Sequence, residues 1–237
     1  MSGIIDIQLV ATTADAAEAS MLFDRVWEAA SMVPPEIIVA ALHSGGYCAL
    51  ARLGDTVVGA SFALASNNGI LHSHVTGVAK GHSGSGIGAQ LKRHQWNWAQ
   101  AHGYRAIGWT FDPLIRRNAW FNLVKLGAEV VSYHENFYGE LADSINSGDH
   151  SDRLYVNWSV SATGNSTSGV FVVATGNDVV VPTPDDIESL RQLDRCAALE
   201  WRLRHRELLR LLWQPSAYIR GLTENSEYVI STNDRKA

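Results

Sequence analysis

The chain has little cysteine and little proline. Its 237 residues include two cysteines and six prolines. Cys48 and Cys196 lie far apart in the sequence and match neither a metal-binding nor a disulfide spacing. Because disulfides belong to oxidising compartments, we expect both thiols to be small buried side chains of a cytoplasmic protein.

Long apolar runs and an excess of basic charge are missing as well. No stretch approaches the roughly eighteen apolar residues of a membrane span, and residues 1–10 lack the basic start and cleavage site of a signal peptide. The net charge is −5 and the isoelectric point is near 6.0, so no basic surface for duplex nucleic acid is implied. We therefore expect a protein of the cytoplasm that binds neither membranes nor nucleic acid.

The chain does contain enough hydrophobic residues for a folded core, at 46% with eight tryptophans. The spacing of these residues predicts an antiparallel meander of strands, then a long helix that crosses over to a further strand. The predicted strands lie at 4–10, 47–53, 56–66, 70–78, 104–111, 129–138 and 154–160, and helices begin near residues 13, 35, 86 and 116. This order predicts an α/β fold with a mixed sheet.

A small, polar loop at 159–169 precedes the last part of the chain. Beyond it we expect strands near 170–174 and 179–181, and a helical stretch with Thr183 as its cap that breaks near Asp194. Strands around Tyr218 and Tyr228 follow. The arginines of the last helix are expected to form a solvated face, at positions 202, 204, 206 and 210. We predict a core at 1–160 and an extension at 161–237 that packs on it.

A glycine-rich turn joins the strand at 70–78 to the long helix. Unpaired backbone N–H groups converge at such a helix start, and glycine lets a phosphate approach closely, so the turn is a candidate anion site. A triphosphate site would need Gly-Lys-[Ser/Thr], which is missing. Gly84 to Ala89 fits a dinucleotide motif formally, but the strand does not run into the first glycine and Asp112 lies too far along the chain.

The segment from Val78 to Leu91 resembles the pyrophosphate loop of the GNAT superfamily of acyl-CoA N-acyltransferases. The resemblance lies in the valine eight residues before Gly86-Ile87-Gly88 and in the leucine that follows. A narrower resemblance, to a bacterial branch of predicted acetyltransferases, covers nearly the whole chain through the stretches 71–74, 109–114, 117–119, 122–128 and 136–140. It implies a GNAT-like fold with a carboxy-terminal α/β extension, and acetyl-CoA or another acyl-CoA as cosubstrate.

The same resemblance nominates the residues that would bind the acyl-CoA. The backbone N–H of Val78 would polarise the thioester carbonyl, and Asn118 would bind the pantetheine arm or serve as a helix cap. The pyrophosphate would lie on Ser83, Gly84, Ser85, Gly86, Ile87, Gly88 and Ala89.

The chain departs from the family pattern at three positions. Arginine or glutamine usually occurs at the position of Ser83, and a second basic residue often occurs at Ser85. Leu123 occupies the position of the tyrosine that protonates the leaving thiolate in many members. Nearby cations could compensate at the loop or could be plain surface charge; they are Lys92, Arg93, Arg116 and Arg117.

Acyl transfer to an amine needs a base, a polarised carbonyl and a proton for the thiolate. The strand at 70–78 has no acid but carries His72 and His74, which share one face at a spacing of two, and histidine suits a base near neutral pH. Both could instead be structural. No metal site is expected, since a third ligand is missing. Tyr138 is the candidate acid and Trp109 the candidate wall of an acceptor pocket, although packing would explain either.

We therefore expect an enzyme, an N-acyltransferase with a small amine acceptor that the sequence does not identify. The resemblance implies acetyl-CoA as the acyl donor. The alternative is a catalytically inactive acyl-CoA-binding sensor or scaffold that lost these side chains. The carboxy-terminal segment would cover the acceptor cleft or help form a homodimer.

Overall fold

The computed structural model describes residues 4–139, 149–160 and 170–233. The chain forms two compact units, Met1–Trp109 with Ser159–Asn165 and Thr110–Trp158 with Ser166–Ala237. The boundary predicted from the sequence follows residue 160. The division differs from it, because residues 110–158 group with the carboxy-terminal segment. That residues 1–160 act as a core stays a prediction. No helix in the described ranges is long and apolar enough to cross a membrane.

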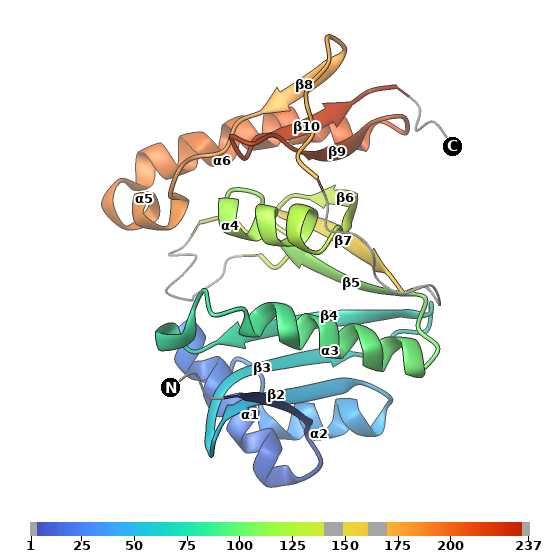
Figure 1. Cartoon of the computed structure of the whole chain (residues 1–237). Coiled ribbons are helices and arrows are strands. Elements are labelled where there is room, and N and C mark those ends of the chain that lie inside the picture. Colours follow the sequence, from blue (N-terminus) through green and yellow to red (C-terminus); the bar gives the residue numbers. More distant parts are fainter. Residues whose placement is uncertain (1–3, 140–148, 161–169, 234–237) are drawn as a thin grey trace. The chain divides into compact units, whose positions relative to one another are not determined.

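The sheet of the first unit is an antiparallel meander that a fifth strand joins in parallel (Figure 1). Its strands are β1 (Ile5–Leu9), β2 (Tyr47–Leu53), β3 (Thr56–Leu64), β4 (Ile70–Val78) and β5 (Ala106–Phe111). The first four pair in chain order, and β5 then pairs with β4 in parallel. A parallel neighbour requires a crossover connection, which here is a helix. The mixed α/β fold predicted from the sequence is confirmed.

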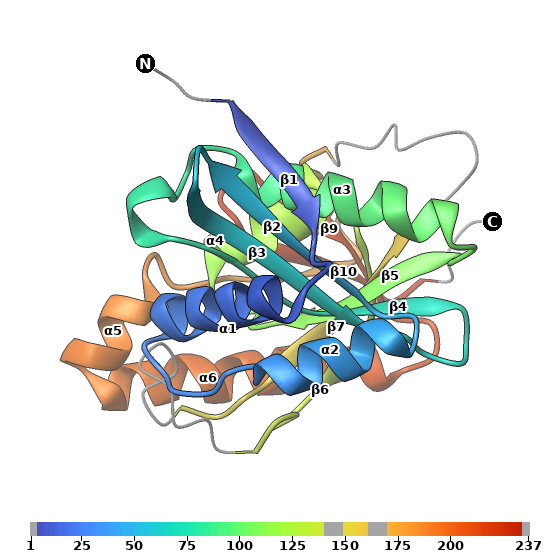
Figure 2. The ribbon, with the colours of Figure 1, turned by 90° about the horizontal axis from the view of Figure 1, so that it is seen from below.

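Helices cover both faces of this sheet (Figure 2). On one face lie α1 (Thr13–Trp27) and α2 (Pro35–His43), and on the other lies α3 (Ile87–Ala101). The sequence fixes where α1 begins, because the Thr12 hydroxyl accepts the Asp15 N–H at 3.1 Å and the Asp15 carboxylate accepts the Thr12 N–H at 3.0 Å. Pro35 occupies the first turn of α2, where its missing N–H costs nothing.

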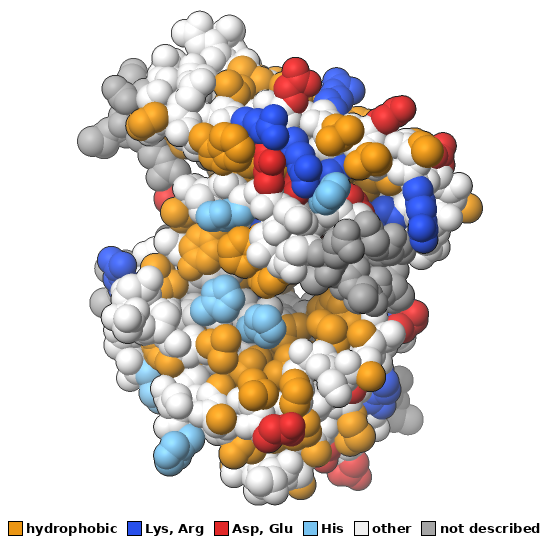
Figure 3. All heavy atoms as spheres, turned by 180° about the vertical axis from the view of Figure 1, so that it is seen from behind, with side chains coloured by type: hydrophobic (Ala, Val, Ile, Leu, Met, Phe, Trp, Pro, Cys, Tyr) orange, Lys and Arg blue, Asp and Glu red, His pale blue; other side chains and the backbone are white. Residues whose placement is uncertain are grey.

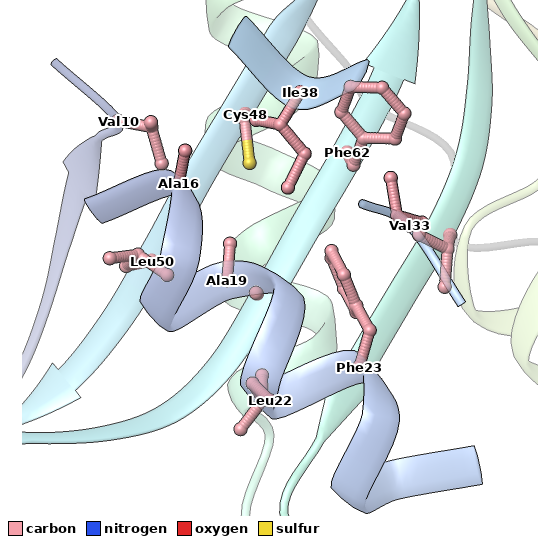
Figure 4. Packing of buried hydrophobic residues seen from close by; sticks show 12 residues of the cluster. Val10, Ala16, Ala19, Leu22, Phe23, Val33, Ile38, Cys48, Leu50 and Phe62 are labelled. Atoms are coloured by element: carbon pink, nitrogen blue, oxygen red, sulfur yellow. The ribbon is translucent and has the colours of Figure 1, made fainter. Parts of the chain in front are cut away.

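The helical spacing of small and apolar residues gives α1 its buried face. Ala16, Ala19, Leu22 and Phe23 are fully buried and pack on side chains from β2 and β3, including Leu50 (Figure 4). Burial of a leucine or phenylalanine side chain of this kind stabilises a fold by about 1.5–3 kcal/mol. This packing holds β3, and through it β4, in place.

The second unit contains a π-helical turn and a small sheet. Its α4 (Arg116–Ala119) continues as a π-helical segment over Trp120–Lys125, and β6 (Glu129–His134) pairs antiparallel with β7 (Arg153–Ser159). The carboxy-terminal extension forms an antiparallel sheet in the order β8-β10-β9 and two helices. These elements are β8 (Asp178–Val181), α5 (Ile187–Leu193), α6 (Arg195–Leu209), β9 (Tyr218–Leu222) and β10 (Tyr228–Ser231).

Several expectations for this part of the chain are wrong. Residues 170–174 form no strand, and their tie to β9 is a hydrogen bond from the Val172 N–H to the Leu222 carbonyl. Asp186, not Thr183, caps the helix, because its carboxylate accepts the Ser189 N–H at 3.0 Å. The predicted break at Asp194 is confirmed, since Asp194 caps α6. Cys48 is buried as expected, but Cys196 is exposed.

The expected solvated arginine face is also wrong at its centre. Arg202 is 0% exposed. It donates to Asp112 at 3.0 and 2.9 Å and to Asp149 at 2.8 Å, and Arg191 joins the same two carboxylates. Burial by itself would raise the pKa of Asp112, but the charges of Arg202 and Arg191 hold that pKa well below its usual range. A buried ionic cluster of this second unit thus replaces the surface charge that the sequence suggested.

Candidate active site

Strand β4 has a bulge at one of the two candidate bases. In its pairing with β3, Val75 lies opposite Phe62 and Ser73 lies opposite Ala63, so His74 is the extra residue. The ring centroids of His72 and His74 are 6.2 Å apart, and His74 meets the ring of Phe62 edge-on, also at 6.2 Å. The prediction that the two histidines share a face is confirmed, and histidines lie among hydrophobic side chains on the face in Figure 3. The bulge itself has no signal in the sequence.

The surroundings of both imidazoles favour their neutral form. Desolvation lowers the pKa of His72, and the positive charges of His74 and Lys92 lower it further. Desolvation also lowers the pKa of His74. A neutral imidazole has a free nitrogen lone pair and can accept a proton from an amine. Among the described residues, no group of three or more His, Cys, Asp or Glu could hold a metal ion.

Strands β4 and β5 part just beyond His72. Their register runs from Ile70 opposite Ala106 to His72 opposite Gly108, whereas β4 continues to Val78. On the side of β4 that faces β3, the N–H of Ala79, just after the strand, donates to the Val58 carbonyl at 2.9 Å. Because hydrogen-bonded pairs alternate in an antiparallel ladder, the backbone groups of Thr76 and Val78 point away from β3. The edge of β4 where it has parted from β5 therefore presents backbone donors, among them the predicted Val78 N–H.

The glycine turn follows directly on this edge. It contains a 3₁₀ turn at Lys80–His82 and leads to Gly86, which caps α3. Gly84 and Gly86 have φ values of +78° and +84°, which a residue with a side chain rarely adopts. A Cβ atom at either position would meet nothing within 4 Å, so the space over both is open. Ile87, Gly88 and Ala89 form the first turn of α3, whose N–H groups have no acceptor in the helix.

The two serines of the turn differ in what they offer. The Ser85 hydroxyl donates back to the His82 carbonyl at 2.6 Å, and Ser83 is exposed. Three basic side chains line a pocket of about 280 Å³ beside the turn, namely Arg25, Lys80 and His82, and none of them was predicted from the sequence as a compensating cation. Lys80 also pairs with Glu28. Of the compensating cations expected from the sequence, Arg116 and Arg117 pair with Asp185 and Glu188 in the second unit.

Of the other two expected cations, Arg93 is exposed on α3, whereas Lys92 is buried. It is 5% exposed, its Nζ lies 2.7 Å from Ser73 Oγ, and the same atom lies 4.1 Å from the ring centroid of Trp109. Desolvation lowers its pKa to about 7. Trp109, which was predicted to line an acceptor pocket, is itself only 6% exposed. A lysine midway along a helix gives no sequence signal that it will point inward.

The remaining predicted site residues belong to the second unit. Tyr138 is 40% exposed, and its hydroxyl lies 3.0 Å from Thr110 Oγ1. Asn118 is half-buried in α4, and Leu123 is buried in the π-helical segment. The structure thus places His72 and His74 side by side on one face of β4, whereas Trp109 packs on Lys92, which also contacts Ser73 between the two histidines. The roles of Tyr138 and Asn118 stay predictions. The carboxylate of Asp112, which a dinucleotide site would need, forms ion pairs with Arg191 and Arg202.

Comparison with known proteins gives matches at the level of structure. No protein-family model matches the sequence, and no curated protein matches it. The ribosomal-protein-S18-alanine N-acetyltransferase from Escherichia coli has 12% identity and a TM-score of 0.55, over 69% of this chain and 99% of that one. A GNAT family acetyltransferase from Elizabethkingia anophelis with acetyl-CoA bound has 18% identity and a TM-score of 0.51, over 65% and 97%.

A third similar structure is an acetyltransferase from Bacillus subtilis in complex with CoA. It has 18% identity and a TM-score of 0.51, over 67% of this chain and 100% of that one. At such identities the likeness establishes the fold. This chain therefore has the mixed α/β fold of the GNAT acetyltransferases, with about a third of its length outside the matched part.

Proposed function

We propose that this protein is an acyl-CoA-dependent N-acyltransferase that moves an acyl group, most simply acetyl, to a small amine. The observation that carries the proposal is the course of β4, which bulges at His74, parts from β5 beyond His72 and leads into the open glycine turn before α3. Similar folds hold acetyl-CoA and CoA. We assign the same cosubstrate to this chain.

In this proposal the pyrophosphate lies against the backbone from Ser83 to Ala89. The open space over Gly84 and Gly86 and the free N–H groups of the first turn of α3 support that placement, because both favour close approach of an anion. The thioester carbonyl accepts from the Val78 N–H, which points to the open edge of β4. Asn118 is proposed for the pantetheine arm.

The chemistry then requires one proton acceptor and one donor. The amine nitrogen attacks the thioester carbon, His74 accepts the proton that the nitrogen loses, and the C–S bond breaks as the thiolate leaves. Tyr138 is our proposed proton donor to that thiolate. His72, the second imidazole of the pair, is the other candidate base. The lowered pKa values of both histidines support the role of base, since each is largely neutral at pH 7.

Release of free CoA thiol from acetyl-CoA, measured across a panel of small amines, tests the proposal. We expect turnover with at least one amine, and His74→Ala should lower kcat by about 10²–10⁴. His43→Ala is the matched control, because His43 is an exposed histidine at the end of α2. Equal losses in both variants would contradict the role of His74.

A second candidate function is binding of acyl-CoA without catalysis. It is favoured by Leu123 in the place of the expected tyrosine and by Ser83 and Ser85 in the place of basic side chains. It predicts acetyl-CoA binding with no thiol release for any amine, and a His74→Ala variant that behaves like the parent protein.

A further inference from the structure

A buried polar chain runs beneath β4, on the face opposite the histidines. It begins at Lys92 Nζ, which lies 2.7 Å from Ser73 Oγ and 3.4 Å from Gln95 Oε1. Gln95 Nε2 then donates to Ser61 Oγ at 3.2 Å, and Ser61 Oγ lies 2.8 Å from Thr76 Oγ1. Two of its members, Ser73 and Thr76, lie on either side of the bulged residue His74 in β4, one residue before it and two residues after it.

The lysine at the head of this chain connects two strands where their backbones no longer pair. Ser73 is the first residue of β4 beyond the last pair with β5, and Trp109 is the first residue of β5 beyond it. Lys92 holds the hydroxyl of one and covers the ring of the other at 4.1 Å. The charge of an ammonium group and the face of an indole ring attract each other, and this attraction is larger in a desolvated site than at the surface.

We propose that Lys92 is a positioning residue for the His72–His74 pair. Its side chain ties Ser73 to Trp109 at the point where β4 and β5 part, and its charge acts on His72 from the opposite face of the strand. The catalytic part of this inference rests on the proposed acyltransferase function, whereas the coupling between Lys92 and His72 can be measured without turnover.

Two observations support the action on His72. Ser73 lies between the two histidines in the chain, so a hydrogen bond that anchors its side chain also restrains the backbone that carries both imidazoles. The positive charge of Lys92 also acts on His72, where it disfavours the imidazolium, after desolvation and the charge of His74. Trp109, Ser73 and Gln95, which surround Nζ, carry no charge.

The histidine titrations followed by NMR in the parent protein, Lys92→Met and Ser73→Ala test the proposal. In Lys92→Met, which keeps the length of the side chain and removes its charge, we expect the pKa of His72 to rise by about half a unit or more. His94 is the internal control, because it lies on the same helix and its pKa is lowered by desolvation alone. Its titration should not move.

Ser73→Ala keeps the lysine and removes the tether. We expect the ring signals of His72 and His74 to shift in this variant and the His94 signals to stay. If the parent protein turns over an amine, both variants should lower kcat by about tenfold to a hundredfold while acetyl-CoA affinity stays within about twofold.

A His72 titration that is unchanged in folded Lys92→Met would overturn the proposal. Should that variant fail to fold, unchanged imidazole signals in Ser73→Ala overturn it instead. Absence of turnover in the parent protein would count against the acyltransferase function and would leave both NMR results decisive for Lys92.

Discussion

A single buried amine, Lys92, illustrates what residue type alone leaves open. Lysine almost always occurs at the surface, and from the sequence this one is a candidate for the pyrophosphate. The structure instead places its ammonium against Ser73 and Trp109, with a pKa lowered to about 7 by desolvation. Its direction depends on how α3 is rotated over the sheet. That rotation is set by packing of Ile87 and Leu91 against β2 and β3, which no pattern local to Lys92 specifies.

This lowered pKa makes a prediction about stability and pH. Lys92 has its ordinary pKa of 10.5 in the unfolded chain and about 7 when folded, so between those values the unfolded state binds more protons. The free energy of unfolding should therefore rise with pH in that window, by up to about 5 kcal/mol. Below pH 7 the lysine is charged in both states, and the buried charge then destabilises the fold by that full amount. Denaturant unfolding of the parent protein and Lys92→Met between pH 6 and pH 9 checks it.

In that comparison the stability advantage of Lys92→Met should be largest at pH 6 and should shrink as the pH rises. A difference between the two proteins that does not change across this range would show that Lys92 keeps an ordinary pKa in the fold.

At the scale of elements, the strands and helices of the first unit follow their sequence signals closely. Gly54 marks the β2–β3 hairpin, Thr12 with Asp15 starts α1, and Gly86 starts α3, because each is a local backbone requirement. The bulge at His74 and the parting of β4 from β5 were not predictable in this way. Both depend on which residues of neighbouring strands face each other, and β-pairing is decided by contacts distant in the chain.

The glycine turn allows a prediction with a matched control. Gly86→Ala and Gly54→Ala each place a side chain at positive φ, at +84° and +59°, and neither Cβ meets an atom within 4 Å. Both should lose about 1–2 kcal/mol of stability through backbone strain. Gly86→Ala should in addition weaken acetyl-CoA binding about tenfold or more, because its methyl group lies where the pyrophosphate is proposed. Thermal unfolding and calorimetric titration separate the two effects.

If Gly54→Ala weakens acetyl-CoA binding as much as Gly86→Ala does, the loss reflects strain in the fold and the turn is not the anion site.

At the scale of the whole molecule, the carboxy-terminal extension supplies charges that residues 110–158 need within the second unit. Arg191 and Arg202 pair with Asp112 and Asp149, and Arg206 pairs with Asp152 at 2.8 Å. These are buried or largely buried carboxylates, and removal of the extension would leave them without those partners. The sequence does not reveal such pairs, because their members lie 42 to 90 residues apart.

Replacement of one arginine tests this dependence. Arg202→Met leaves Asp112 and Asp149 with a single guanidinium, and breaking a buried ionic group costs about 3–5 kcal/mol. Arg204 is exposed on the same helix, so Arg204→Met should change stability by no more than about 0.5 kcal/mol. Urea unfolding at neutral pH measures both. Similar stabilities for the two variants would show that the cluster does not hold the extension to residues 110–158.

We propose that β4 and the glycine turn form a site for acyl-CoA. Calorimetric titration of the intact protein with acetyl-CoA, with CoA and NADH as comparisons, tests it most directly. We expect saturable binding of acetyl-CoA with a Kd on the order of micromolar, similar binding of CoA and no binding of NADH. If neither CoA species gives a heat of binding up to about 1 mM, the glycine turn is not an acyl-CoA site and the protein is not an acyl-CoA-dependent acyltransferase.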